Sequence, residues 1–121
     1  MQKLILPHNH NHINKFENIT IELSKTDNFD LVSNTFKQLG DSTRMRIFWF
    51  LCHYEECVTN LAALLNMTSP AISHHLRVLK DCGLVTSSRI GKEVYYKAAD
   101  TLQCQLMHQM IEQVMEITCP K

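Results

Sequence analysis

The strongest constraint in this sequence is a short helical segment, a tight turn and a second helix in direct succession. Leucines at helical spacing fill residues 58–65, and Asn66-Met67 then predicts a tight turn. Ser69 followed by Pro70 predicts the start of the second helix, because serine caps free amides and proline suits the first turn. That helix should end near residue 81, with three residues facing the core: Ile72, Leu76 and Leu79. A second helix held in this way projects from the core and fits the major groove of B-DNA.

The segments around this pair predict a hairpin and three more helices. Residues 84–89 and 93–97 are β-prone runs joined by Ile90-Gly91-Lys92, which is typical of a hairpin. Apolar residues recur at helical spacing in three other segments, residues 29–39, 44–51 and 102–117. Gly40 should end the first of these helices, and Asp41-Ser42 should cap the second.

This order of elements predicts a winged helix-turn-helix, a mainly α fold with a β-hairpin. We expect about five or six helices and a two-stranded wing over residues 26–118, after a His/Asn-rich extension over residues 1–25. The length of 121 residues fits one domain. No apolar run is long enough to span a membrane and no secretory signal is present, so we expect a cytoplasmic protein without a membrane partner. The five cysteines, none in a Cys-x-x-Cys pair, are then expected to be reduced thiols.

Polar and basic side chains lie where this fold would meet DNA. The formal net charge of the chain is zero, but residues 68–97 contain five basic and two acidic residues. Segregated positive charge indicates a nucleic-acid surface. The expected DNA-binding residues lie on the second helix and the hairpin tip: Thr68, Ser69, Ser73, His74, His75, Arg77, Arg89 and Lys92. Taken one at a time, each is equally compatible with an ordinary solvated or capping residue.

Several motifs in series resemble the arsenic-repressor family of metal sensors (ArsR/SmtB type) over about residues 34–100. The resemblance rests on Leu39-Gly40-Asp41-Ser42-Thr43-Arg44, Glu56-Cys57-Val58-Thr59-Asn60-Leu61-Ala62, Ser69-Pro70-Ala71-Ile72-Ser73-His74-His75-Leu76, Gly83-Leu84-Val85 and Gly91-Lys92-Glu93-Val94-Tyr95-Tyr96. It implies a homodimer, joined through its first and last helices, that represses transcription on double-stranded operator DNA and leaves when an inducer binds. It also places Ser69, Ser73 and His74 at base-reading positions. The apolar excess of the last helix agrees with a dimer interface.

The family's inducer site on the third helix uses a Cys-Val-Cys pattern, which this chain keeps only in part. Cys57 matches the first cysteine, whereas Thr59 replaces the second. Relatives with this site recruit ligands from the N-terminal extension, where this chain offers three histidines: His8, His10 and His12. One thiolate with imidazoles suits zinc or a similar divalent ion, so our first expectation is a zinc site of Cys57 and these histidines, with His53 as a substitute ligand. The alternative is a buried cysteine and a weakly scavenging histidine tract.

The family's other metal site, on the last helix, is incomplete in this sequence. Asp100 and Glu116 match ligand positions, but Leu102 and Gln113 replace the histidines. Our second expectation is a site on the same helix, where three potential ligands follow at spacings of four: Cys104, His108 and Glu112. The alternative is a plain polar helix face.

Two further hypotheses concern the cysteines and the class of protein. Some relatives form a disulfide between the second and last helices, so a thiol switch by oxidation or persulfidation would use Cys52 and Cys119. A chain without any inducer site is another alternative, and a metal-storage protein is a more remote one. An enzyme is not expected, because the sequence has no His-Glu-x-x-His motif, nucleophile elbow or phosphate loop.

Overall fold

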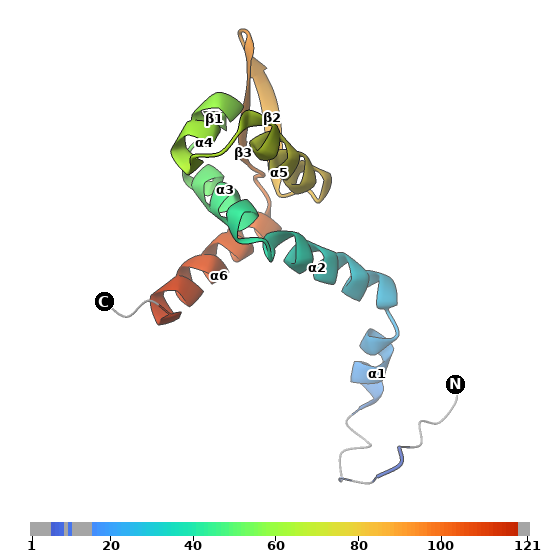
Figure 1. The fold of residues 1–121 in the computed structure, drawn as a ribbon. Helices are drawn as coiled ribbons and strands as arrows, with labels where there is room; N and C mark the ends of the chain where they lie inside the picture. The colour runs from blue at the N-terminus through green and yellow to red at the C-terminus, as the bar shows by residue number, and fades with distance from the viewer. Residues whose placement is uncertain (1–5, 9, 11–15, 119–121) are drawn as a thin grey trace. The chain divides into compact units, whose positions relative to one another are not determined.

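The computed structural model describes residues 6–8, 10 and 16–118 (Figure 1). Within these residues the chain forms six helices and one antiparallel sheet. In chain order, the elements are α1 (Glu17–Leu23), α2 (Thr26–Leu39), α3 (Ser42–His53), β1 (Glu56–Cys57), α4 (Val58–Leu65), α5 (Ser69–Asp81), β2 (Val85–Ile90), β3 (Glu93–Ala98) and α6 (Leu102–Thr118). The chain consists of two compact units, residues 1–33 and 34–121. The predicted winged helix-turn-helix is confirmed in the second unit, whereas the expected domain boundary at residues 25 and 26 stays a prediction.

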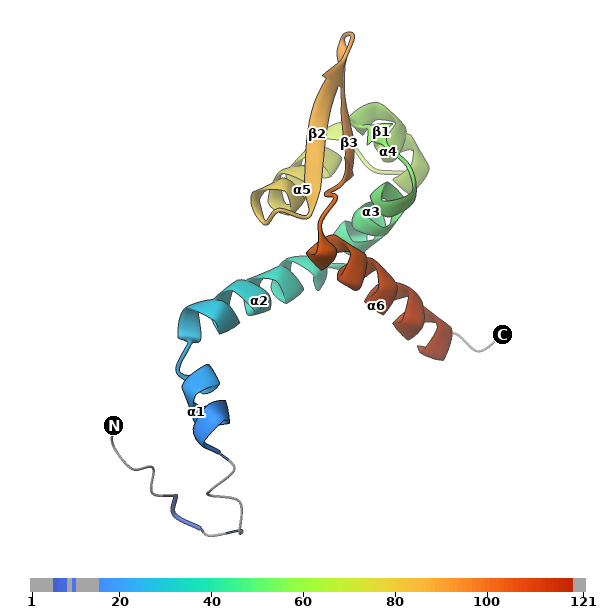
Figure 2. The same ribbon diagram turned by 180° about the vertical axis from the view of Figure 1, so that it is seen from behind.

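The core of the second unit lies between α3, α4, α5 and the base of the hairpin (Figure 2). Its largest fully buried side chains come from all of these elements: Phe48, Ile47, Leu61, Ile72, Leu76, Leu79, Leu84 and Val85. The predicted stripe of α5 is confirmed, because Ile72, Leu76 and Leu79 are each 0% exposed. Since these three residues occupy one face of the helix, the opposite face, which bears His74 and Arg77, is exposed.

Two side chains cap the helices that build this core. Asp41 accepts the backbone N–H of Arg44 at 2.9 Å and begins α3, as predicted. The predicted Ser69 cap of α5 is wrong, since Thr68 is the capping residue and its Oγ1 accepts the N–H of Ala71 at 3.3 Å. A cap bonds to the amide two or three residues ahead, so the cap at Thr68 places Ser69 and Pro70 inside the first turn, where proline is still tolerated.

The end of α5 turns the chain directly into the hairpin. Gly83 has a φ of +79°, a left-handed conformation that glycine adopts without a steric penalty. The N–H of Gly83 donates to the carbonyl of Lys80, and the N–H of Leu84 donates to that of Leu79. These two bonds form a Schellman motif, and its usual apolar contact is supplied by Leu79 and Leu84, which are both buried.

The sheet has the strand order β1-β3-β2, and its main part is the predicted wing. Ile90 pairs with Glu93, which leaves Gly91 and Lys92 as a two-residue turn. Gly91 has a φ of +65°, as the first central position of a type II′ turn requires. The sequence did not predict β1, in which Cys57 pairs with Tyr95 of β3, because a strand of two residues leaves no readable alternation. Both ribbon views show the hairpin extending beyond the helices (Figures 1 and 2).

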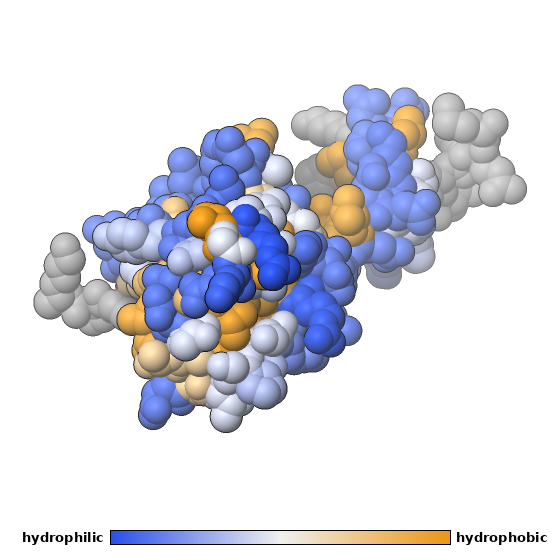
Figure 3. Space-filling model, turned by 90° about the horizontal axis from the view of Figure 1, so that it is seen from above, coloured by the Kyte–Doolittle hydropathy of each residue, from blue (hydrophilic) through white to orange (hydrophobic). Residues whose placement is uncertain are grey.

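Helix α6 leaves an apolar stripe uncovered. Its buried side contains Cys104 and Ile111, whereas six apolar residues on the rest of the helix are 39–80% exposed: Leu102, Leu106, Met110, Val114, Met115 and Ile117. In the first unit, α1 and the start of α2 also expose large apolar side chains: Ile19, Ile21, Leu23, Phe29, Leu31 and Val32. Figure 3 shows apolar side chains at the surface among hydrophilic ones. Exposed apolar surface of this extent marks an interaction site. None of the described helices is long and apolar enough to cross a membrane.

The cap of α3 gives a stability prediction. Replacing Asp41 with alanine leaves the Arg44 N–H without its acceptor and should lower the free energy of unfolding by about 1 kcal/mol. Asp41→Asn is the matched control, because the amide oxygen of asparagine caps equally well. Urea unfolding at pH 7 and one fixed protein concentration measures both variants, and equal losses in the two would contradict the capping role.

Candidate nucleic-acid interface and metal-ligand cluster

The outward face of α5 presents most of the side chains expected to contact DNA. Thr68, Ser69, His74 and Arg77 are exposed, and Ser73 and His75 are partly buried. Small hydroxyl side chains in the first turns allow the helix to approach a base edge closely, and a guanidinium two turns later is positioned for phosphate. The arrangement is that of a helix able to lie in a major groove.

The wing lies beside α5 and has an exposed cationic tip. Arg89 and Lys92 are both exposed, and Arg89 Nε donates to the carbonyl oxygen of Gly91 at 3.4 Å. Lys80 Nζ donates to Ser87 Oγ at 2.8 Å, which joins the last turn of α5 to β2. This bond fixes the wing relative to the helix, so the two surfaces can contact one duplex together.

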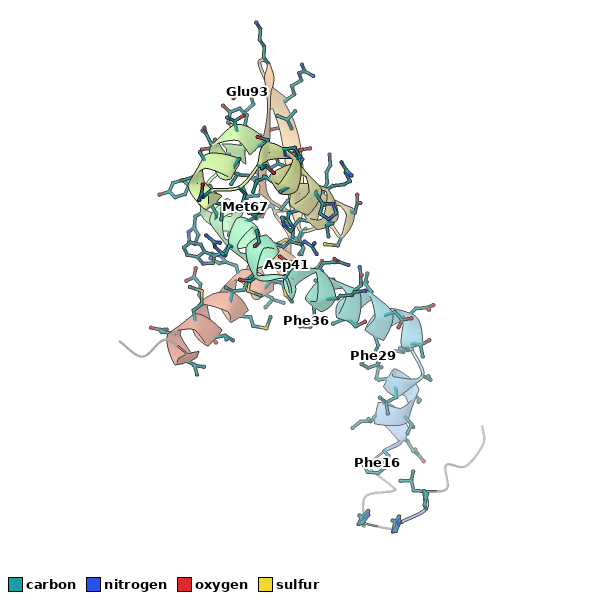
Figure 4. All side chains as sticks on the ribbon, viewed as in Figure 1. Phe16, Phe29, Phe36, Asp41, Met67 and Glu93 are labelled. Carbon is teal, nitrogen blue, oxygen red and sulfur yellow. The ribbon has the colours of Figure 1, made fainter. Side chains whose placement is uncertain are left out.

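His75 has an internal partner that the sequence did not reveal. Arg44 Nε donates to His75 Nδ1 at 3.4 Å, and Arg44 Nη1 donates to the Gln38 side-chain and backbone oxygens at 2.8 and 3.2 Å. Burial lowers the pKa of His75 below its usual 6.5, although the Asp41 carboxylate acts in the opposite direction. A neutral His75 therefore connects α5 to the first turn of α3, whereas the neighbouring His74 side chain is exposed. Asp41 is labelled at this junction in Figure 4.

A second set of polar residues converges where α3 and α6 meet. His53 is the last residue of α3, and His108 and Glu112 lie one turn apart on α6. His53 Nε2 lies 3.2 Å from His108 Nε2 and 3.4 Å from Glu112 Oε1, and His108 Nε2 also contacts Glu112 Oε1. These are the only three residues in the described part of the chain whose donor atoms are grouped as a metal site would require.

Cys104, the third member of the expected α6 set, lies elsewhere. It is 3% exposed, and its Sγ donates to the Leu84 carbonyl oxygen at 3.4 Å. Its thiol is therefore held in the core, whereas His108 and Glu112 lie in the more exposed cluster with His53. The structure thus does not bring Cys104 together with His108 and Glu112 as expected, and His53 lies beside these two residues instead.

The ligands of the other expected zinc site are not brought together by anything the structure describes. Cys57 is buried, at 6% exposed, and precedes α4. His8 and His10 are exposed in the first unit, with ring centroids 6.0 Å apart. His12 lies outside the described residues. The site of Cys57 with these histidines stays a prediction.

Of the two cysteines in the thiol-switch hypothesis, the structure describes only Cys52, and the surroundings of this thiol do not activate it. Burial raises the pKa of Cys52 to about 12, with further contributions from Cys104 and Glu112. A thiol with this pKa is protonated at neutral pH and is a poor nucleophile. Its expected partner, Cys119, lies outside the described residues.

The sequence alone did not predict which residues lie beside His53. In the sequence it stands near Cys57, which makes it no more than a substitute ligand there. Its true neighbours on α6 are 55 residues further along the chain. Periodicity locates residues on one helix, but it does not say which ends of two helices meet.

Comparison with known proteins agrees with this fold and surface. The family described as "Bacterial regulatory protein, arsR family" matches residues 41–87. The chain is 30% identical over 105 residues to the transcriptional repressor SmtB homolog of Synechocystis sp., covering 87% of this chain and 80% of the relative. It is 35% identical over 97 residues to the cadmium resistance transcriptional regulatory protein CadC homolog of Staphylococcus aureus, covering 79% of each.

A solved structure supports the fold. The homodimeric winged helix-turn-helix DNA-binding domain of Mb0332 from Mycobacterium bovis superimposes with a TM-score of 0.70 at 21% identity, covering 96% of this chain and 94% of that domain. Both the sequence relatives and this structure match the elements that carry the exposed α5 and the wing. The chain belongs to the arsR family of bacterial regulatory proteins and is a winged helix-turn-helix transcriptional regulator, not an enzyme.

Proposed function

We propose that this protein is a dimeric repressor that binds double-stranded operator DNA and leaves it when it binds a divalent metal ion, with zinc favoured. The observation that carries the proposal is the outward polar face of α5, which the buried stripe of Ile72, Leu76 and Leu79 holds in place. The adjoining wing adds cations in the same region. The relatives named as repressors of the SmtB and CadC type support the same function.

In the proposed complex, the two parts of the surface have different tasks. Ser69, Ser73 and His74 approach base edges from the first turns of α5 and so supply sequence preference. Arg77 of α5 and the wing residues Arg89 and Lys92 bind phosphates, which fixes the register but adds no sequence information.

The exposed apolar surface of α6 supports the proposed dimer. Pairing two copies through α6 would bury the stripe of Leu106, Met110 and Val114, and the homodimeric Mb0332 domain supports such an assembly. A twofold axis would present two α5 helices to successive major grooves, about 34–36 Å apart.

Metal release requires that the ion bind the DNA-free arrangement of the dimer more tightly than the DNA-bound one. A coupling free energy of about 1–3 kcal/mol changes operator affinity about 5- to 150-fold. Histidine and carboxylate donors are among those that zinc accepts, so they are compatible with zinc as the ion.

The DNA surface is tested by removing the phosphate-binding side chain of α5. An operator is first selected from random duplexes by the full-length protein, and affinity is then measured by fluorescence anisotropy at several salt concentrations. Arg77→Ala should weaken binding to all duplexes, and the slope of log affinity against log salt should shrink by about 0.9 for each phosphate that the variant no longer neutralises. Lys37→Ala is the matched control, because Lys37 is exposed on α2 and carries the same charge. Equal effects of the two substitutions would contradict a phosphate contact at Arg77.

The inducer is tested on the same complex. Adding zinc to the reduced protein on its operator should lower affinity by at least about fivefold, and a chelator should restore it. The proposal of metal release fails if neither zinc, cadmium, cobalt nor nickel changes the affinity.

The link between His75 and Arg44 predicts a pH dependence of stability. The pKa of His75 is lowered in the folded chain, so its contribution to stability is complete above the ordinary value of 6.5 and is lost as the pH falls through the folded value. His75→Gln should therefore lose less stability than the wild type between pH 7.5 and pH 5.5 in urea unfolding. His74→Gln, one residue away and exposed, should keep the wild-type slope, and a wild-type slope in His75→Gln would contradict the assignment.

A further inference from the structure

We propose that His53, His108 and Glu112 form a divalent metal site within one protomer, which clamps the end of α3 to α6. The site takes a zinc-type ion with two imidazole nitrogens and one carboxylate oxygen, and its fourth position is open to water. Metal binding at these residues stands independently of the proposed repressor function. The regulatory consequence described below rests on that function.

Two of the three distances between the donor atoms match the requirement of a small ion, and the third pair, His108 Nε2 and Glu112 Oε1, would have to move apart to bind it. Tetrahedral zinc with bonds of about 2.0–2.2 Å holds neighbouring donors about 3.3–3.6 Å apart. The two Nε2 atoms lie 3.2 Å apart, and His53 Nε2 lies 3.4 Å from Glu112 Oε1. Both imidazoles thus already direct the same nitrogen toward one carboxylate oxygen.

Hydrogen bonds alone satisfy this arrangement poorly. Two facing imidazole nitrogens can share only one proton, and Glu112 Oε1 has both rings as neighbours, so one contact of the three has no proton. A single cation accepts a lone pair from all three atoms at once. The ordinary alternative is a His–Glu hydrogen bond at a helix end, but it would require only one of the two histidines.

The solvent exposure of the three ligand side chains favours a metal ion that exchanges with solvent. The side chains of His53, His108 and Glu112 are 38%, 27% and 48% exposed, respectively. The two histidines also line an open cavity of about 380 Å³. A site with three ligands and solvent access suits an exchangeable inducer better than a closed structural ion does.

The indole ring of Trp49 packs against His53, and its fluorescence can report metal binding at this histidine. The rings of Trp49 and His53 are packed 4.7 Å apart, and their planes are tilted by 59°. Trp49 is the only tryptophan in the chain. Its buried Nε1 has no hydrogen-bond partner among the described residues, so its emission should respond to changes at His53.

The position of the cluster connects metal to the proposed DNA surface. α3 bears His53 at its last position and Arg44 in its first turn, where Arg44 donates to His75 of α5. On α6, the exposed Leu106 and Met110 lie on the side of the helix away from His108 and Glu112. A clamp between α3 and α6 therefore fixes the angle between the helix that holds α5 and the helix proposed to join the dimer.

The test measures metal binding and DNA release separately on the full-length reduced protein. Binding is followed by Trp49 emission, by the visible absorption of Co²⁺ and by zinc titration calorimetry. Glu112→Gln and His108→Gln should each lower affinity by more than about 100-fold, because loss of even an outer partner of a metal ligand costs about 10–100-fold. Glu116→Gln, the same change one turn further along α6, and Cys57→Ser should bind as the wild type does. Circular dichroism without metal checks that each variant folds.

Each outcome decides a different point. Weak zinc binding in Glu112→Gln and His108→Gln, with normal binding in Cys57→Ser, supports the site. Loss of binding in Cys57→Ser but not in His108→Gln overturns it. If zinc releases Glu112→Gln from the operator as it releases the wild type, the regulatory role of the site is wrong and the metal-responsive repressor function stands. If zinc binds at the site but leaves the operator complex intact, the site stands and metal release is wrong.

Discussion

Burial of one aliphatic stripe on α5 determines which residues this protein presents to a partner. Ile72, Leu76 and Leu79 are withdrawn completely from solvent, and this fixes the rotation of the helix about its own axis. A turn of 100° per residue then directs His74 and Arg77 outward, whereas Ser69 is exposed because it lies at the N-terminal end of the helix. The helix is also fixed at both ends, by the Thr68 cap and by the reversal at Gly83. Because Leu84 belongs to both the reversal and the core, the same packing sets where the wing begins.

Helix α3 contacts both the helix proposed to read DNA and the last helix of the chain. Its first turn contacts α5 through Arg44, and its last residue contacts α6 through His53. In the regulation that we propose, α3 carries a change of angle at the α6 end to the α5 end. Regulation by an ion at the α3–α6 junction needs no movement inside the core, only a preference between two arrangements of packed helices.

The sequence predicted those features that depend on local periodicity and turn chemistry. The α5 stripe, the hairpin and the cap at Asp41 are each set by residues a few positions apart. It did not predict features that depend on distant partners. The β1 strand exists only because Tyr95 and Tyr96 lie opposite Cys57 and Glu56, and the role of His53 depends on how α3 meets α6. Spacing by four suggested Cys104 as a ligand, but α6 packs against the core at that position, so the thiol is buried and donates to the Leu84 carbonyl oxygen. The predicted capping residue of α5, Ser69, was wrong by one position, which is the usual uncertainty at a helix end.

The central claim is that two copies of α5 read successive turns of one duplex. Methylation interference on a selected operator tests it most directly, because it locates the guanines whose major-groove edges must be free. Two clusters of interference are expected, centred about 10–10.5 base pairs apart and related by twofold symmetry. A single cluster, or interference confined to the minor groove, would contradict the claim.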